Sequence, residues 1–211
     1  MRIAMGHRAL AAVLALACWS LASREARSAE VDGSTVEIHG GTVTFDATTN
    51  IPAIGIHGKS TALEGRARIR QTVDGLVIEQ LEAGLAVRTL NSGIGLRDEH
   101  MRRYVSTTPE GLQPDIRFVA GRVLCSGSDR VRRCQLSGDL IIRETPRPFA
   151  IALKVSDDGN SFHVAGDGVV KLSAYGIPPP SQLGVTTTDD VKLHVDFVVK
   201  RVEERLARSI R

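Results

Sequence analysis

The sequence predicts a mainly β protein built from eight antiparallel strands, with one short helix between two of them. Apolar residues recur with a period of two along most of the chain after residue 30, which is typical of strands with one buried and one wet face. Interruptions in this pattern indicate β-bulges, which bend a sheet. We expect closure into a barrel, because closure removes exposed sheet edges; a two-sheet sandwich fits the periodicity equally well.

The chain begins with a pattern that is typical of an exported protein. Arg2 and Arg8 precede a short apolar run that cannot span a bilayer as a stable helix. We therefore expect residues 1–28 to be a signal peptide and the protein to be periplasmic or secreted. Anchoring as a lipoprotein through Cys18 is a second hypothesis, although Ala15 fits that processing motif poorly.

The formal net charge of +3 comes from the expected signal peptide. Residues 1–28 carry four arginines and one glutamate, so the rest of the chain is close to neutral. Positive charge therefore gives no argument for nucleic-acid binding.

The strands follow from alternation and from the turns between them. Gly40-Gly41 interrupts the first strand, and the apolar phase slips between Ile78 and Leu81; both features predict bulges. Asp-Gly and Ser-Gly pairs mark hairpin turns. We expect one domain over residues 31–202, a charged tail over 203–211, and strands near 35–48, 60–71, 76–88, 115–125, 131–143, 147–156, 161–173 and 189–201.

Residues 85–123 connect the third expected strand to the fourth through a short charged helix. A helical crossing in a chain of strands is expected to cover one end of the barrel. Cys125 and Cys134 flank the next hairpin turn, where antiparallel neighbours can meet disulfide geometry in an exported protein. We predict this disulfide; two buried thiols are the alternative.

The interior of an eight-stranded barrel either fills with its own side chains or holds one ligand. Inward positions are mostly Val, Leu, Ile, Ala and Gly, and the part after residue 28 contains no tryptophan. Small side chains leave room for an elongated apolar ligand. Close packing by branched aliphatic side chains is the open alternative.

The densest charged cluster lies in the expected helix. At helical spacing Arg97 and His100 share a face, as do Asp98 and Arg102. Three interpretations remain open: a solvated helix with internal ion pairs, a polar rim for a ligand headgroup, or acid–base chemistry by His100 in a lipid-directed hydrolase or isomerase. No second histidine lies at metal-ligand spacing, and no nucleophile is marked by its context.

Two further segments border the expected strands. His57, between Gly55 and Gly58, is expected to be a turn residue, with a ligand contact as the alternative. Residues 174–180 end the seventh strand with three consecutive prolines, which are expected to hold an open barrel end in shape.

A series of landmarks over residues 33–200 resembles a known family. They occur in one order: Val43-Thr-Phe45, Gly55-Ile-His57, Leu63-Glu-Gly65-Arg, Leu96-Arg97-Asp98-Glu-His100-Met101, Pro114-Asp-Ile116-Arg-Phe118, Leu136-Ser-Gly138-Asp-Leu140, Lys171-Leu-Ser-Ala-Tyr175-Gly176-Ile177 and Asp190-Val191-Lys-Leu193. With these landmarks the sequence resembles the YceI-like proteins, secreted bacterial lipocalin-like barrels that bind polyisoprenoids or related lipids. The family usually has a glycine turn where this chain has Arg143-Glu144-Thr145.

The resemblance implies an eight-stranded antiparallel lipocalin-like β-barrel with a short helix covering one end. It implies a binding protein, not an enzyme, that holds a polyisoprenoid or similar lipid for transport or storage, without cofactor, metal or nucleic acid. Transient membrane contact and a dimer are compatible with it, and a structural barrel without ligand remains the alternative. The residues expected to contact the ligand are His57, Arg97, His100, Phe118 and Tyr175.

Overall fold

The computed structural model of the protein describes residues 33–128 and 130–201. The expected signal peptide (1–28), with Cys18, and the expected tail (203–211) lie outside the described residues. The elements are, in order, β1 (Ser34–His39), β2 (Thr42–Thr49), β3 (Gly55–Ser60), β4 (Leu63–Thr72), β5 (Gly75–Leu85), η1 (Val87–Thr89), α1 (Gly95–Ser106), β6 (Ile116–Ala120), β7 (Val123–Gly127), β8 (Val131–Ile142), β9 (Thr145–Asp157), β10 (Ser161–Lys171), η2 (Leu172–Tyr175), β11 (Ser181–Gln182) and β12 (Val185–Arg201).

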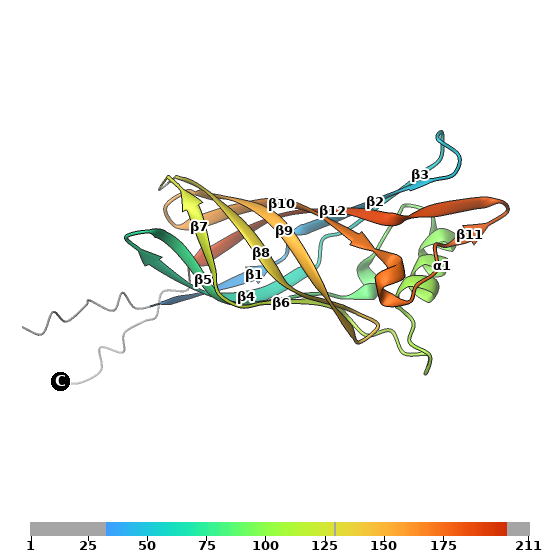
Figure 1. The fold of residues 1–211 in the computed structure, drawn as a ribbon, viewed down its shortest axis with the longest axis horizontal. Coiled ribbons are helices and arrows are strands. Elements are labelled where there is room, and N and C mark those ends of the chain that lie inside the picture. The colour runs from blue at the N-terminus through green and yellow to red at the C-terminus, as the bar shows by residue number, and fades with distance from the viewer. Residues whose placement is uncertain (1–32, 129, 202–211) are drawn as a thin grey trace, which may run out of the picture. The chain divides into compact units, whose positions relative to one another are not determined.

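Eight strand positions form an antiparallel ring (Figure 1). Three of these positions are filled by two consecutive strands each: β1 with β2, β3 with β4, and β6 with β7. The ring then continues through β8, β9, β10 and β12. Because β12 pairs with both β1 and β2, the sheet closes on itself. The predicted barrel is confirmed, and the sandwich alternative is excluded.

Both predicted interruptions are present. Gly40 has a φ of 82°, and a Cβ at Gly41 would lie 2.5 Å from the Cβ of Phe197, so glycine is needed where β1 passes into β2. Between β4 and β5 the register slips by one residue at Glu79. These irregularities let long strands bend around the ring.

Two strands begin earlier than predicted. The sequence places the second strand from residue 60, but β3 pairs with β2 along its whole length. Gly58 lies within this strand. A Cβ at Gly58 would be 2.1 Å from the Cζ of Phe45, so the glycine makes room for the phenyl ring. The last strand begins at Val185 and not at 189. A bulge between Thr187 and Val191 obscures its alternation in the sequence.

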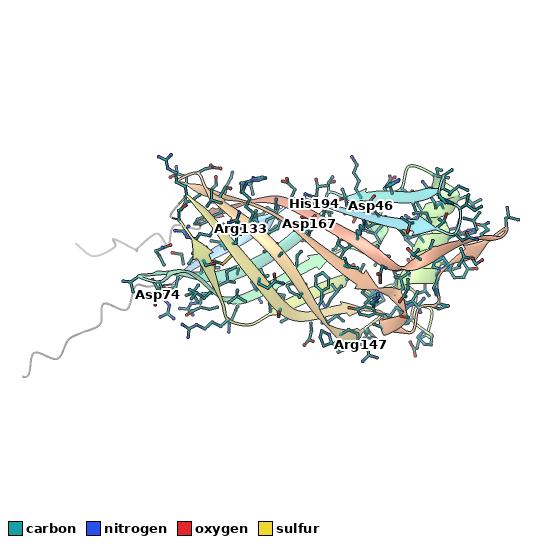
Figure 2. The ribbon with its side chains drawn as sticks, turned by 45° about the horizontal axis from the view of Figure 1, so that its top comes forward. Asp46, Asp74, Arg133, Arg147, Asp167 and His194 are labelled. Atoms are coloured by element: carbon teal, nitrogen blue, oxygen red, sulfur yellow. A yellow bond between two sulfur atoms is a disulfide. The ribbon has the colours of Figure 1, made fainter. Side chains whose placement is uncertain are left out.

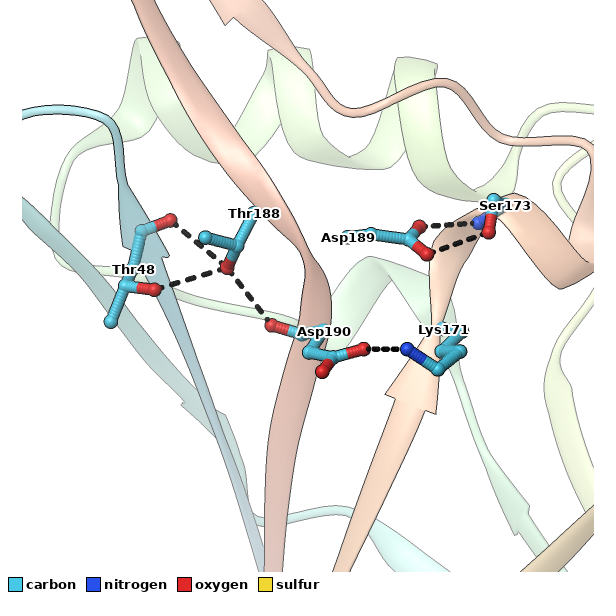
Figure 3. Close-up of polar contacts among 6 residues, drawn as sticks. All are labelled: Thr48, Lys171, Ser173, Thr188, Asp189 and Asp190. Carbon is cyan, nitrogen blue, oxygen red and sulfur yellow. Dashed lines mark hydrogen bonds and ion pairs between the residues drawn. The ribbon is translucent and has the colours of Figure 1, made fainter.

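The bulge in β12 also anchors η2, as Figure 3 shows. The carboxylate of Asp189 accepts hydrogen bonds from the hydroxyl (2.6 Å) and the backbone N–H (2.7 Å) of Ser173. These hydrogen bonds hold the pKa of Asp189 below its usual value. Lys171 donates to Asp190 at 2.6 Å, and this hydrogen bond raises the pKa of Lys171. Together these contacts fix the turn that leads into the proline-rich loop.

The turn between β8 and β9 consists of two residues with positive φ, Arg143 (51°) and Glu144 (62°). Ile142 pairs with Thr145, so this is a two-residue hairpin of the type that favours glycine. A side chain in this conformation costs about 1 kcal/mol or more. We expect Glu144→Gly to raise the free energy of unfolding by about 0.5–1 kcal/mol in urea denaturation. Glu144→Ala keeps the Cβ and is the control; equal stabilisation by both would contradict a backbone cause.

The barrel end farther from α1 is filled by side chains. Cys125 and Cys134 form a disulfide there, as the hairpin position predicts, and both are buried. Leu136, on the same strand face as Cys134, has no exposed surface. The buried Arg132 donates from Nη2 to Gln71 at 3.3 Å. These contacts leave the free interior volume toward α1.

Candidate ligand-binding site

A cavity of about 660 Å³ occupies the α1 end of the barrel interior. This volume is typical of small-molecule sites, which are mostly apolar with a few polar groups. Strands from all around the ring contribute to the wall, because inward side chains alternate with outward ones. The apolar wall includes Ile38, Phe45, Leu81, Leu136, Leu153 and Val195. Of the two alternatives that the sequence leaves open, the structure has the hollow interior.

Small side chains and partly exposed inward residues make this hollow. Leu81, Ala83, Leu193 and Val195 are only half-buried although they pack against the core. Their inward surface faces the cavity and is available to a ligand. At the filled end the inward Phe162, in contrast, is 3% exposed.

The mouth of the cavity lies between α1 and the β11–β12 hairpin. His100, Met101 and Tyr104 contribute from α1, and Gln182 and Leu183 contribute from the hairpin. His100 Nδ1 lies 3.4 Å from Gln182 Oε1 and joins the two sides. The helix therefore takes part in the cavity wall, at the barrel end that the sequence predicts it to cover.

Arg97 is the clearest polar group in the cavity wall. Its Nε donates to the hydroxyl of Ser92 and its Nη2 to the Ser92 carbonyl, both at 2.9 Å. Among the described residues, no carboxylate lies within ion-pair distance of Arg97. The neighbouring Asp98 is buried and accepts from the Ser92 N–H at 2.7 Å and from its hydroxyl. The wall thus holds a half-buried guanidinium that two hydrogen bonds orient; the Ser92 hydroxyl links it to the Asp98 carboxylate, and no carboxylate of the described residues contacts it directly.

The rest of the charged cluster faces outward or supports the loop before the helix. Glu99 and Arg103 form an ion pair at 2.7 Å on the exposed side. Arg102 donates to the carbonyl of Leu90 at 3.1 Å, so the predicted proximity to Asp98 does not produce a pair. The solvated-helix interpretation therefore describes one side of α1, and Arg97 with His100 forms the side toward the cavity.

Phe118, one of the residues expected to contact the ligand, lies in the cavity wall. Its ring meets that of Phe149 edge to face, with 5.7 Å between centroids and an interplanar angle of 86°. Phe149 in turn lies against Gly168, where a Cβ would be 2.6 Å from the ring. This aromatic pair gives the wall a fixed shape between β6 and β9.

Tyr175 has a structural position and is not part of the cavity wall. It lies in η2 within a second apolar cluster that includes Leu140 and Ile177. Its hydroxyl donates to the carbonyl of Leu140 at 3.1 Å, and burial raises the pKa of Tyr175 to about 12. The residue pins η2 to β8 beneath the proline-rich loop.

Removing this hydroxyl is expected to cost stability. Tyr175→Phe should lower the free energy of unfolding by about 1 kcal/mol near neutral pH, because the Leu140 carbonyl loses its donor. Since folding raises the pKa, the stabilising contribution is complete below pH 10 and is lost as the pH rises toward 12. Denaturation curves from neutral to alkaline pH should show this additional loss of unfolding free energy in the wild type and not in Tyr175→Phe. Tyr104→Phe, at an exposed site, is the control; a loss as large there would contradict the assignment.

His57 lies on the outer face of the barrel. Its Nδ1 pairs with Asp46 across the β2–β3 hairpin, and its side chain is 76% exposed. The strand alternation turns Gly58 and Ile56 inward and His57 outward. A similar outward pair, His194 with Asp167 at 2.8 Å, lies on β12 and β10 (Figure 2). His57 is thus neither a turn residue nor part of the cavity wall.

Several wall residues were not among those predicted to contact a ligand. Ile54, Ile56, Gln182 and Leu183 reach the mouth from two hairpins. The isoleucines lie in a segment that the sequence assigns to a turn, and β11 has only two residues. The pattern of apolar residues at every second position up to His57 is the signal that could have revealed the first pair.

Neither metal-ligand clusters nor helices that could span a membrane are found in the part of the chain that the structure describes. There, no group of three or more His, Cys, Asp or Glu side chains is placed to hold a metal ion. Likewise, none of the helices within 33–128 and 130–201 is long and apolar enough to cross a membrane.

Comparison with known proteins agrees with this architecture. The YceI-like domain matches residues 29–199. Solved structures with the same fold include Burkholderia cenocepacia BcnA (14% identity, TM-score 0.56, 75% of this chain and 95% of that one). A polyisoprenoid-binding domain from Saccharophagus degradans, implicated in plant cell wall breakdown, has 11% identity and a TM-score of 0.59 over 81% of this chain and 100% of that one. The YceI protein of Campylobacter jejuni has 13% identity and a TM-score of 0.56 over 71% and 86%. No curated protein matches the sequence.

Proposed function

Because the chain belongs to the YceI-like family, we propose that it is a binding protein that holds an elongated apolar lipid, of the polyisoprenoid class, inside its barrel. The single observation that carries this proposal is the cavity of about 660 Å³ with an almost wholly apolar wall. A structurally similar domain from Saccharophagus degradans is described as polyisoprenoid-binding.

The physical chemistry of the cavity suits a long hydrocarbon chain. Each buried methylene contributes roughly 0.8 kcal/mol, so a chain can bind without many polar contacts. The wall is built from aliphatic side chains with the Phe118–Phe149 pair on one side. Branched and unsaturated prenyl units match such a surface.

The polar end of the ligand belongs at the mouth. Arg97 and His100 both line the cavity there, on the inner side of α1. Arg97 offers an oriented positive charge without a carboxylate partner among the described residues. An anionic or strongly hydrogen-bonding headgroup would complete that site.

The setting of this function is the periplasm or the exterior of the cell. The expected signal peptide and the disulfide between Cys125 and Cys134 support this placement, since disulfides persist in exported compartments. A cavity with a mouth at one end and packed side chains at the other supports transport or storage of the lipid as its role.

Protein purified from its own host tests the proposal. Native mass spectrometry should show a bound species that organic extraction releases and identifies as a prenyl lipid. A cavity that stays empty in the purified protein, and that takes up no added prenyl lipid, would contradict it.

A catalytic role for His100 is not favoured by its surroundings. Within the described residues it has no carboxylate partner; it contacts Gln182, and its ring lies 6.2 Å from that of Tyr104. His100→Ala should leave binding of an uncharged prenyl alcohol largely intact, because the apolar wall holds the chain. The extracted lipid should be chemically unchanged after incubation with either protein. Turnover of the lipid that depends on His100 would restore the enzyme interpretation.

A further inference from the structure

Beside α1, the rim of the cavity is formed by two segments without charged residues. Although 24% of the chain is charged, residues 47–56 and 172–188 contain no Asp, Glu, Lys or Arg. The first segment makes the β2–β3 turn, and the second runs from η2 to the β11–β12 hairpin. Figure 1 shows both hairpins extending beyond the ring at the α1 end.

These tips present large apolar side chains to the outside. Leu183 is 97% exposed, and Ile51 and Ile54 are 39% and 41% exposed. Tyr104, a residue type suited to the boundary between water and lipid, is 57% exposed at the same mouth. Apolar side chains gathered on an uncharged surface mark a contact site.

The two tips are tied together, and their backbone groups are largely satisfied internally. The side chain of Asn50 donates to the Gly184 carbonyl at 3.0 Å and accepts from the Thr186 N–H at 2.9 Å. The hydroxyl of Thr49 donates to the Ile54 carbonyl at 2.8 Å. Such internal pairing lowers the penalty of placing turns in hydrocarbon, where unpaired peptide groups are strongly unfavourable.

The exposed surface continues into the cavity. Ile54 and Leu183 are exposed at the tips and also line the cavity, so an apolar path joins the outer surface of the tips to the interior of the barrel. We propose that the two hairpin tips dock on the surface of a lipid bilayer, with the mouth of the cavity facing the membrane. A lipid chain can then pass between the bilayer and the cavity without crossing water. This inference rests on the proposed lipid-binding function. Contact through a few side chains makes the docking peripheral and reversible.

Sedimentation with phosphatidylcholine vesicles tests the docking. Because the tips carry no charge, the wild-type protein should bind these neutral vesicles at both low and high salt. Ile51→Asp and Leu183→Asp should each reduce the bound fraction by about tenfold or more, since a carboxylate is costly in the membrane. Asp tolerates the positive φ of Leu183 (52°). Val73→Asp, at a 102% exposed position in the β4–β5 turn, is the matched control and should bind like the wild type.

A second measurement separates this inference from the proposed function. Ile51 does not line the cavity, so Ile51→Asp should bind geranylgeraniol in vesicle-free solution as the wild type does. If the wild type binds geranylgeraniol but not vesicles, the docking is overturned and the lipid-binding function stands. If the wild type binds vesicles but no prenyl lipid, the proposed lipid-binding function is contradicted and the membrane-docking surface is supported. Vesicle binding that needs anionic lipid and disappears at high salt would also overturn the docking. So would a dimer, detected by light scattering, in which a second copy of the chain covers the tips.

Discussion

Val195→Trp is expected to weaken binding of geranylgeraniol by about a hundredfold or more. Val195 lines the inner part of the cavity from β12, opposite Gly166 of β10. The space beside Gly166 is already taken by Leu153, whose Cδ2 would lie 2.4 Å from a Cβ there. The indole must therefore turn into the cavity and exclude part of the chain. Each methylene that loses its contacts costs roughly 0.8 kcal/mol, so losing about four of them reaches this effect.

Chain length and a matched variant make this prediction specific. Geraniol, with half as many prenyl units, should lose much less affinity, because it can stay near the mouth. Val198→Trp adds the same ring on the same strand at an outward, 49% exposed position and should bind both alcohols normally. Displacement of a fluorescent fatty acid measures the affinities, and urea denaturation checks that both variants fold. An unchanged affinity for geranylgeraniol in folded Val195→Trp would show that the chain does not enter the barrel.

The sequence predicts the ring better than its contents. Alternation located the eight strand positions, and Gly40–Gly41 and the phase slip near Glu79 marked the bends, because these signals are local in the chain. The hollow interior is not local. It depends on which small and large side chains meet across the ring, and this follows from the register of pairs such as Val195 with Gly166.

The same limit explains the outcomes for the predicted contact residues. Arg97 and His100 line the cavity because one side of α1 faces it, which helical spacing can indicate. His57 points outward because its segment is a strand, and reading Gly55 and Gly58 as turn residues hid the alternation. Tyr175 lies in η2, whose three-residue period a strand pattern cannot represent, so its packing against Leu140 was not foreseeable.

Removing the charge of Arg97 is expected to weaken binding of geranylgeranyl phosphate by about tenfold to a hundredfold, and binding of geranylgeraniol far less. Hydrogen bonds to a charged group contribute about 1.5–3 kcal/mol, and this guanidinium is half-buried, where salt screens it little. Arg97→Gln tests the charge, and Arg97→Lys should recover part of the phosphate affinity. Because Arg97 also donates twice to Ser92, both variants need the alcohol as an internal reference.

Arg102→Gln is the matched control on the same helix. Arg102 is half-buried and donates to the Leu90 carbonyl at 3.1 Å, but it does not line the cavity, so its replacement should leave the preference for phosphate unchanged. A loss in Arg97→Gln that is equal for the phosphate and the alcohol would mean that Arg97 acts through Ser92 and the shape of the mouth. A selective loss for the phosphate, present in Arg97→Gln and absent in Arg102→Gln, would place the anionic end of the ligand at Arg97 and fix the direction in which the chain enters the barrel.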